Sequence, residues 1–151
     1  MIVDAPPAAH LLRSRTDRRS RRRADLLVGR FAAAFPDIAF DVLWETDTCN
    51  AQAFVRDGVR HVRLYGGLCR HRQVGLAGLA FALAHEAGHH LAGPPSPEYH
   101  PLLASQEAAD AWAVETGLVV AFGAARARHY GVAGPRQIAR VYVALSSTDR
   151  P

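Results

Sequence analysis

The sequence predicts an α+β fold in which helices pack on one face of a small antiparallel sheet. Three observations support this fold class. Residues 38–65 alternate between apolar and polar positions, as strands do. Residues 73–91 are apolar on nearly every side, which is typical of a buried central helix. Two later segments, 105–123 and 134–145, repeat their apolar residues at helical spacing.

The elements before the buried helix have clear boundaries. A helix is expected over residues 24–35, because its apolar residues recur every three or four positions and a proline follows. Strands are expected at 38–44, 50–56 and 59–65. The Asp57-Gly58 pair between the last two strands favours a tight turn, so these strands should form an antiparallel hairpin.

The later helices carry start and stop signals. Gly93-Pro94-Pro95 should end the buried helix. Ser105 is a suitable N-cap for the next helix, which should end near Gly123. Gly134-Pro135 is expected to open the last helix, because proline is favoured in a first helical turn.

Arginines are concentrated near the N-terminus. The chain has 18 basic residues, all arginine, and a net charge of +4, and residues 13–30 hold eight of these arginines against two acids. Like charges repel one another, and the arginine-rich part of residues 1–23 has no apolar side chains to bury. Residues 1–23 are therefore predicted to form a flexible basic arm. The folded domain is then expected over residues 24–147, followed by a short tail at 148–151.

Length and composition fit one soluble globular domain, with 151 residues of which 49% are hydrophobic and 21% charged. The longest apolar run, Leu76 to Ala84, is too short for a transmembrane segment, and no secretory signal is visible. We therefore expect a cytoplasmic protein. Cys49 and Cys69 flank the hairpin and could pair, but two reduced thiols are the default in that compartment.

The buried helix contains the strongest functional signal, the H-E-x-x-H motif His85-Glu86-Ala87-Gly88-His89. Histidines four residues apart lie on one helix face, so both imidazoles can bind one metal ion. Ionisable groups in an apolar helix are costly without a partner, and a metal ion supplies one. The motif predicts Zn²⁺ held by His85 and His89, with Glu86 as the general base that takes a proton from metal-activated water during peptide-bond hydrolysis.

A third metal ligand has to come from another segment. The extended motif H-E-x-x-H-x-x-G-x-x-H fails, because alanine and proline stand at its last glycine and histidine positions. A glutamate from the following helix is the other common arrangement, so Glu107 is the predicted ligand, with Asp110 as the acceptor that orients a ligand histidine. Asp110 as the direct ligand is the main alternative, and Glu98 and His100 are weaker ones.

These motifs, in this order, resemble the compact gluzincin metallopeptidases, which include the CAAX-prenyl-protease type and the ImmA/IrrE type. The resemblance covers about residues 38–115 and rests on CNAQAF at 49–54, VRLYGGL at 62–68, LAHEAGHHL at 83–91 and the helix at 105–112. Many relatives place the ligand glutamate four residues before an aspartate (E-x-x-x-D). In this chain Glu107 and Asp110 are only three residues apart.

The resemblance implies a zincin-like fold with its site at the foot of the sheet. It also implies that a peptide or protein substrate adds in extended form to an edge strand at residues 50–54. Relatives of the first type are often embedded in membranes, whereas this chain shows no spanning segment, which favours the soluble branches.

Other residues have less definite roles. Hydrolysis needs a donor to the developing oxyanion besides the metal. The candidates on or before the last helix are Tyr142, His129, Tyr130 and Arg140, and Tyr142 could equally be a core aromatic. Asn50 either holds the end of a strand or contacts the substrate backbone. His90 points away from the ligand face and is interpreted as a packing or capping residue.

A different class of function also fits the charge distribution. The domain could act as a binding or regulatory module through Arg13–Arg23, with nucleic acid, an acidic protein or an anionic membrane surface as its partner. The segment lacks the interleaved aromatic residues that stack on bases. A protease that cleaves a single regulatory protein is a third alternative. The intact His85, Glu86 and His89 favour an enzyme.

Overall fold

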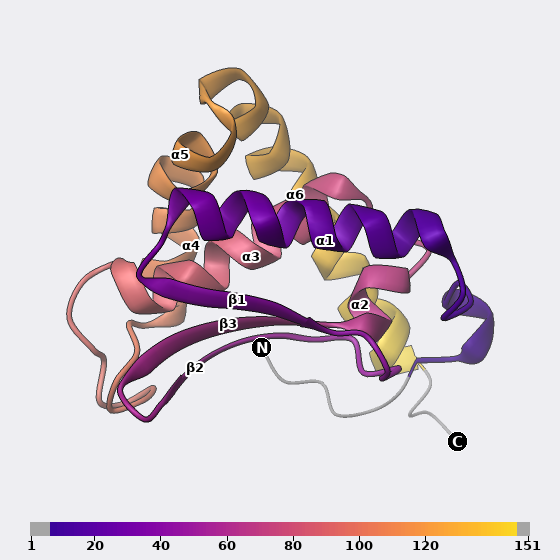
Figure 1. The fold of residues 1–151 in the computed structure, drawn as a ribbon, viewed down its shortest axis with the longest axis horizontal. Coiled ribbons are helices and arrows are strands. Elements are labelled where there is room, and N and C mark those ends of the chain that lie inside the picture. The colour runs from indigo at the N-terminus through magenta and orange to yellow at the C-terminus, as the bar shows by residue number, and fades with distance from the viewer. Residues whose placement is uncertain (1–6, 148–151) are drawn as a thin grey trace.

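The computed structural model describes residues 7–147, in which helices lie on one side of a three-stranded sheet (Figure 1). The elements in chain order are η1 (Ala9–Leu11), α1 (Arg18–Ala34), β1 (Ile38–Leu43), β2 (Ala51–Arg56), β3 (Val59–Tyr65), α2 (Gly66–Arg70), α3 (Leu76–Leu91), α4 (Gln106–Trp112), the π-helical turn η2 (Ala113–Gly117), α5 (Leu118–Phe122) and α6 (Ala124–Ser147). The predicted α+β class is confirmed.

The sheet is mixed, so the prediction of an antiparallel sheet is wrong for one of its two pairings. β2 and β3 form the expected antiparallel hairpin, with Asp57 and Gly58 both at positive φ. β1 runs parallel to β3, and the strand order is β1-β3-β2. The connection from β1 to β2 passes over the start of α2, where a side chain at Gly66 would collide with the backbone of Trp44. This close packing joins segments that are distant in the sequence.

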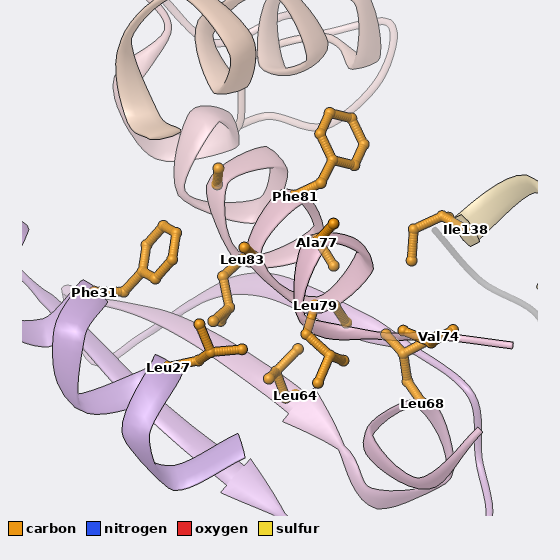
Figure 2. Close-up of a cluster of buried hydrophobic side chains, with 14 of the residues drawn as sticks. Leu27, Phe31, Leu64, Leu68, Val74, Ala77, Leu79, Phe81, Leu83 and Ile138 are labelled. Carbon is orange, nitrogen blue, oxygen red and sulfur yellow. The ribbon is translucent and has the colours of Figure 1, made fainter. Parts of the chain in front are cut away.

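The core surrounds α3, which packs between the sheet, α1 and α6. Figure 2 shows Leu27 and Phe31 of α1 directed toward Leu83 of α3, with Leu64 of β3 close to Leu79. Residues 77–90 of α3 are all buried, as the apolar sequence of this helix predicts. Because α3 is enclosed in this way, the side chains in its second half are held in fixed positions.

The flexible-arm prediction for residues 1–23 is wrong over residues 9–23. α1 begins at Arg18, and Leu12 forms a bridge with His71 beside α2. Arg23 donates from Nη2 to the carbonyl oxygens of Cys69 and Val74, at 3.2 and 3.4 Å. Arg23 reaches these carbonyls because a long side chain can pack along the protein while its guanidinium group finds polar partners. Residues 1–6 and 148–151 of the predicted arm and tail lie outside the described residues.

The start of the last helix also differs from the prediction. Gly134-Pro135 was predicted to open the last helix. In the structure α6 begins ten residues earlier, at Ala124, and Pro135 lies inside it. Gly134 instead lies against Phe81 and the carbonyl of Ala77, so its missing side chain allows α6 to approach α3 closely. Ser105 caps α4 as predicted, by accepting a hydrogen bond from Ala108 N at 3.2 Å.

Cys49 and Cys69 are both buried free thiols, as the default prediction held. Burial raises the pKa of each thiol to about 12, so both are protonated at neutral pH and poorly reactive. Within residues 7–147, none of the helices has the length and apolar character that crossing a bilayer requires.

One half-buried ion pair joins α2 to the loop between β1 and β2. Arg70 is 2% exposed and donates to Asp47 Oδ1 at 2.6 Å, and this hydrogen bond lowers the pKa of Asp47 below its ordinary 3.8. Asp47→Asn is expected to reduce the free energy of unfolding at pH 7 by about 1 kcal/mol, because Arg70 loses its counter-charge. The expected loss is modest because solvent screens the Asp47 side chain, which is 48% exposed.

Urea denaturation measures this loss, with Glu45→Gln as the control, since Glu45 makes only an exposed 3.9 Å pair with Arg15. A depressed carboxyl pKa stabilises the folded state above the unfolded pKa. The difference between wild type and Asp47→Asn should therefore shrink as the pH falls below 3.8. Equal losses for the two variants at pH 7 would contradict the assigned role of Arg70.

Candidate metal centre

His85, Glu86 and His89 come together in the second half of α3. Their ligand-type atoms lie within 4.8 Å of one another, and all three side chains are buried. The two imidazole rings meet edge to face with their centroids 4.8 Å apart. This proximity follows from the helix itself, because residues four apart are neighbours on one helix face.

Hydrogen bonds determine which nitrogen of each histidine is free. His85 Nδ1 donates to Asp110 Oδ1 at 2.7 Å, and His89 Nδ1 donates to the carbonyl of Ala104 at 2.8 Å. Both acceptors require a proton on Nδ1, which leaves each Nε2 with a free lone pair. Among the described residues, the buried Nε2 of His85 has no hydrogen-bond partner. Two such nitrogens side by side are suited to a cation.

Burial keeps both rings neutral. It lowers the pKa of His85, although the neighbouring Asp110 opposes the shift, and it lowers the pKa of His89 to about 4. A neutral imidazole is the form that binds metal. The two histidines are therefore ready to act as ligands at neutral pH without first losing a proton.

The contact between Asp110 and His85 depends on close packing of α4 against α3. A Cβ atom added at Gly88 would lie 2.9 Å from the backbone of Ala109, so glycine permits this approach. Ala104 N also donates to the carbonyl of His89 at 2.8 Å, which holds the start of α4 against the end of α3. Asp110 therefore occupies the orienting position that the sequence predicted for it.

The Glu86 side chain extends from α3 to β2, which is one of the two edge strands of the sheet. Its Oε2 accepts a hydrogen bond from the backbone N–H of Ala53 in β2, at 2.9 Å. Burial raises the pKa of Glu86 to about 7, although the Ala53 hydrogen bond opposes the shift. His90 donates from Nε2 to the carbonyl of His61 in β3 at 2.9 Å, so it anchors the helix, in agreement with its predicted packing role. A carboxylate of raised pKa thus lies beside an edge strand.

The structure does not bring Glu107 into this cluster. Its side chain is exposed in the first turn of α4, and it is not among the grouped atoms of His85, Glu86 and His89. The two alternative ligands in the loop do not join the cluster either. Glu98 is exposed, and His100 Nδ1 accepts a hydrogen bond from Leu102 N. Glu107 points elsewhere because successive residues of a helix are rotated by about 100°, so position 107 lies on a different face of α4 from position 106.

Gln106 and Tyr99 are the residues near the histidines that the sequence prediction missed. Gln106 lies near enough to His85 to oppose the lowering of its pKa, and Gln106 Nε2 donates to Tyr99 Oη at 3.1 Å. Tyr99 stacks on the ring of His89 with centroids 5.0 Å apart, and its Oη lies 3.5 Å from His89 Nε2. A signal for Gln106 was present, because it stands four residues before Asp110 in the E-x-x-x-D spacing of the resembled family.

The predicted oxyanion donors are widely separated. Tyr142 lies in α6 and lines a cavity of about 370 Å³ together with Phe81 and Asp110. Burial and the charge of Glu86 raise the Tyr142 pKa, which places this phenol within electrostatic range of the cluster. His129 instead neighbours Tyr130, whose ring packs on Phe122.

Two further candidates remain to be placed. Arg140 is exposed on α6. The Asn50 side chain accepts a hydrogen bond from Ala51 N at 2.9 Å, so the structure shows Asn50 in the strand-end role.

Comparisons of the chain with protein-family models, with curated protein sequences and with solved structures find no match. Any function therefore has to be argued from the geometry of this site.

Proposed function

We propose that this protein is a zinc-dependent metallopeptidase of the gluzincin type with a zincin-like fold, in which His85 and His89 bind Zn²⁺ and Glu86 is the general base. The observation that carries the proposal is a pair of buried neutral imidazoles beside a buried carboxylate, with Nδ1 of both rings occupied, no partner at His85 Nε2 and only a 3.5 Å contact with Tyr99 Oη at His89 Nε2. An unsatisfied buried nitrogen such as His85 Nε2 costs about 1–3 kcal/mol, and a bound cation would offset that cost.

The remaining donors suit the same ion. Zinc accepts imidazole nitrogen and oxygen ligands. Tyr99 Oη lies 3.5 Å from His89 Nε2, and Gln106 Nε2 donates to that hydroxyl, so both side chains lie beside the histidines. We assign Gln106 as the third ligand in place of Glu107, because Gln106 lies on the face of α4 that carries Asp110, four residues further on, whereas the Glu107 side chain is exposed.

When bound, zinc would activate a water molecule and polarise the scissile carbonyl group. Glu86 then accepts a proton and passes it to the leaving amine. One of its oxygens is held by Ala53 N, so the other is available for the proton. Asp110 and the Ala104 carbonyl keep both histidines in the tautomer that presents Nε2. The Tyr99 hydroxyl, with Tyr142 as the more distant alternative, donates to the developing oxyanion.

The surroundings of the site favour an extended peptide substrate with an apolar side chain. β2 is an outer strand, and its Ala53 N–H points away from β3 toward Glu86. A peptide can add to such an edge through main-chain hydrogen bonds. The cavity beside Asp110 is lined mainly by apolar residues, among them Phe81, Val114 and Ile138. This cavity would accept one apolar side chain of the peptide.

Metal loading tests the proposal directly. Elemental analysis of the purified protein is expected to find one zinc ion per chain. The zinc-loaded protein should hydrolyse members of a mixed peptide pool, detected by mass spectrometry. A strong chelator should abolish hydrolysis, and added zinc should restore it. A fully zinc-loaded protein that cleaves no peptide would refute the peptidase proposal.

Asp110→Ala is expected to weaken zinc binding by roughly 10–100-fold, because His85 loses the acceptor that fixes its tautomer and raises its basicity. Competition with a chromophoric chelator measures the change. Glu115→Ala is the matched control, since Glu115 is an exposed acid in the turn that follows α4 and should leave the affinity unaltered. The assignment fails if both variants bind zinc as tightly as the wild type.

A further inference from the structure

A second recess lies away from the metal centre, along α1. It has a volume of about 420 Å³ and is bounded by α1, the start of α3, the end of α5 and the first turns of α6. Figure 1 shows α1 with the sheet on one side and α5 and the start of α6 on the other. We call this recess the arginine groove, because five arginines line it: Arg19, Arg22, Arg23, Arg30 and Arg126. None of its lining residues is acidic.

Three of these guanidinium groups lack a counter-charge. Arg19, Arg22 and Arg126 are exposed and have no hydrogen bond or ion pair within the described part of the chain. Arg23 is engaged with backbone carbonyls, and burial together with nearby arginines lowers its pKa. Arg30 donates to the carbonyl of Ala121 at 3.0 Å, so the partner of its guanidinium group is a neutral carbonyl and not a carboxylate. The groove therefore concentrates positive charge that no described residue neutralises.

The groove also exposes aliphatic surface between its arginines. Leu26 is 64% exposed and Leu76 is 42% exposed, and both line the groove. On α1 the lining positions 19, 22, 23, 26, 27 and 30 follow helical spacing and extend over roughly 16 Å of one face. A ligand that matched this face would carry several negative charges and apolar groups between them.

We propose that the arginine groove binds an acidic protein segment with interspersed apolar side chains. Several unpaired cations along a helix call for several anionic groups, which one small anion does not supply. Nucleic acid would supply them, but single strands bind through stacking on open aromatic rings. Here Tyr130 is buried and the Phe122 ring is covered by Arg30, whose guanidinium lies 5.1 Å from its centroid. The open apolar residues are leucines, which favour apolar side chains over bases.

This surface is separate from the metal centre. Leu76 precedes His85 by nine positions, roughly 14 Å along α3. The inference is therefore independent of the proposed zinc chemistry. It also relocates the predicted interaction of the arginine-rich segment from a flexible arm to one ordered helix face.

Fluorescence anisotropy tests the proposal with a fluorescein-labelled synthetic peptide composed of glutamate and leucine at helical spacing. The groove variant Arg19→Glu/Arg22→Glu/Arg126→Glu should bind it roughly 10–100-fold more weakly at physiological salt. The control variant Arg18→Glu/Arg128→Glu/Arg136→Glu carries the same charge change on the same two helices outside the groove. It should retain most of the affinity, because none of its three arginines lines the groove.

Leu26→Ser and an all-glutamate peptide of equal length test the apolar contribution, and each should weaken binding. Zinc content and the hydrolysis of short uncharged peptides should be the same in all these variants as in the wild type, which separates this surface from the metal centre. Equal binding by the groove and control variants would overturn the proposal. Tighter groove-dependent binding of duplex DNA than of the peptide would overturn it too, as would undiminished binding of the all-glutamate peptide.

Discussion

Glu86→Gln is expected to lower kcat for peptide hydrolysis by roughly 10²–10⁴-fold while the protein keeps its zinc. Glutamine preserves the shape of the side chain, and its amide oxygen can still accept the hydrogen bond from Ala53 N. It cannot accept a proton as a carboxylate does. Steady-state kinetics on a peptide identified from the pool, together with elemental analysis of the same sample, measures both quantities.

The fold of this variant should remain intact. Glu86 is completely enclosed and its pKa is raised by burial, so replacing it with a neutral amide removes no stabilising charge. Thermal unfolding should therefore occur at the same temperature as in the wild type or higher. If the variant retains its zinc and hydrolyses the peptide at the wild-type rate, Glu86 is not the general base.

Gln106→Glu is expected to increase zinc affinity by roughly tenfold or more, because a carboxylate replaces a neutral amide beside two zinc-binding imidazoles. Gln106→Ala should have the opposite effect. The expectation rests on the position of Gln106 beside His85, where it opposes the lowering of the His85 pKa, and on its hydrogen bond to Tyr99 Oη. Competition titration against a zinc chelator of known affinity measures these changes at a fixed pH.

Glu107→Gln is the matched control for these variants. Glu107 is the neighbour of Gln106 in sequence but its side chain is exposed, so the change should leave zinc affinity within about twofold of the wild type. The reverse pattern, in which Glu107→Gln loses zinc and Gln106→Ala retains it, would return the third-ligand role to Glu107.

Features that depend on neighbouring residues were predictable from the sequence. The hairpin follows from Asp57-Gly58, whose positive φ angles a tight turn demands. The buried helix follows from its apolar surface, and the meeting of His85 with His89 follows from their four-residue spacing. The zinc chemistry assigned to them remains a proposal.

Features that depend on contacts between distant segments were not predictable in this way. The parallel pairing of β1 joins it to β3, a strand that does not follow it directly in the sequence. The choice between Gln106 and Glu107 depends on the rotation of α4, which is held by the packing of Ala109 against Gly88. Tyr99 comes from a loop whose path has no local periodicity, so only the folded chain shows it stacked on His89.

The sequence by itself determined the α+β class, the hairpin and the pair of histidines on one helix face, because helix and turn geometry is local. The tertiary structure decided the mixed sheet, the side chains that surround the histidines and the ordering of the N-terminal arginines. Those outcomes depend on which surfaces pack together. The arginines illustrate the point: their charge alone predicted a flexible arm, but Arg23 of α1 donates to the carbonyl of Cys69, and Arg70 of α2 donates to the carbonyl of Arg13.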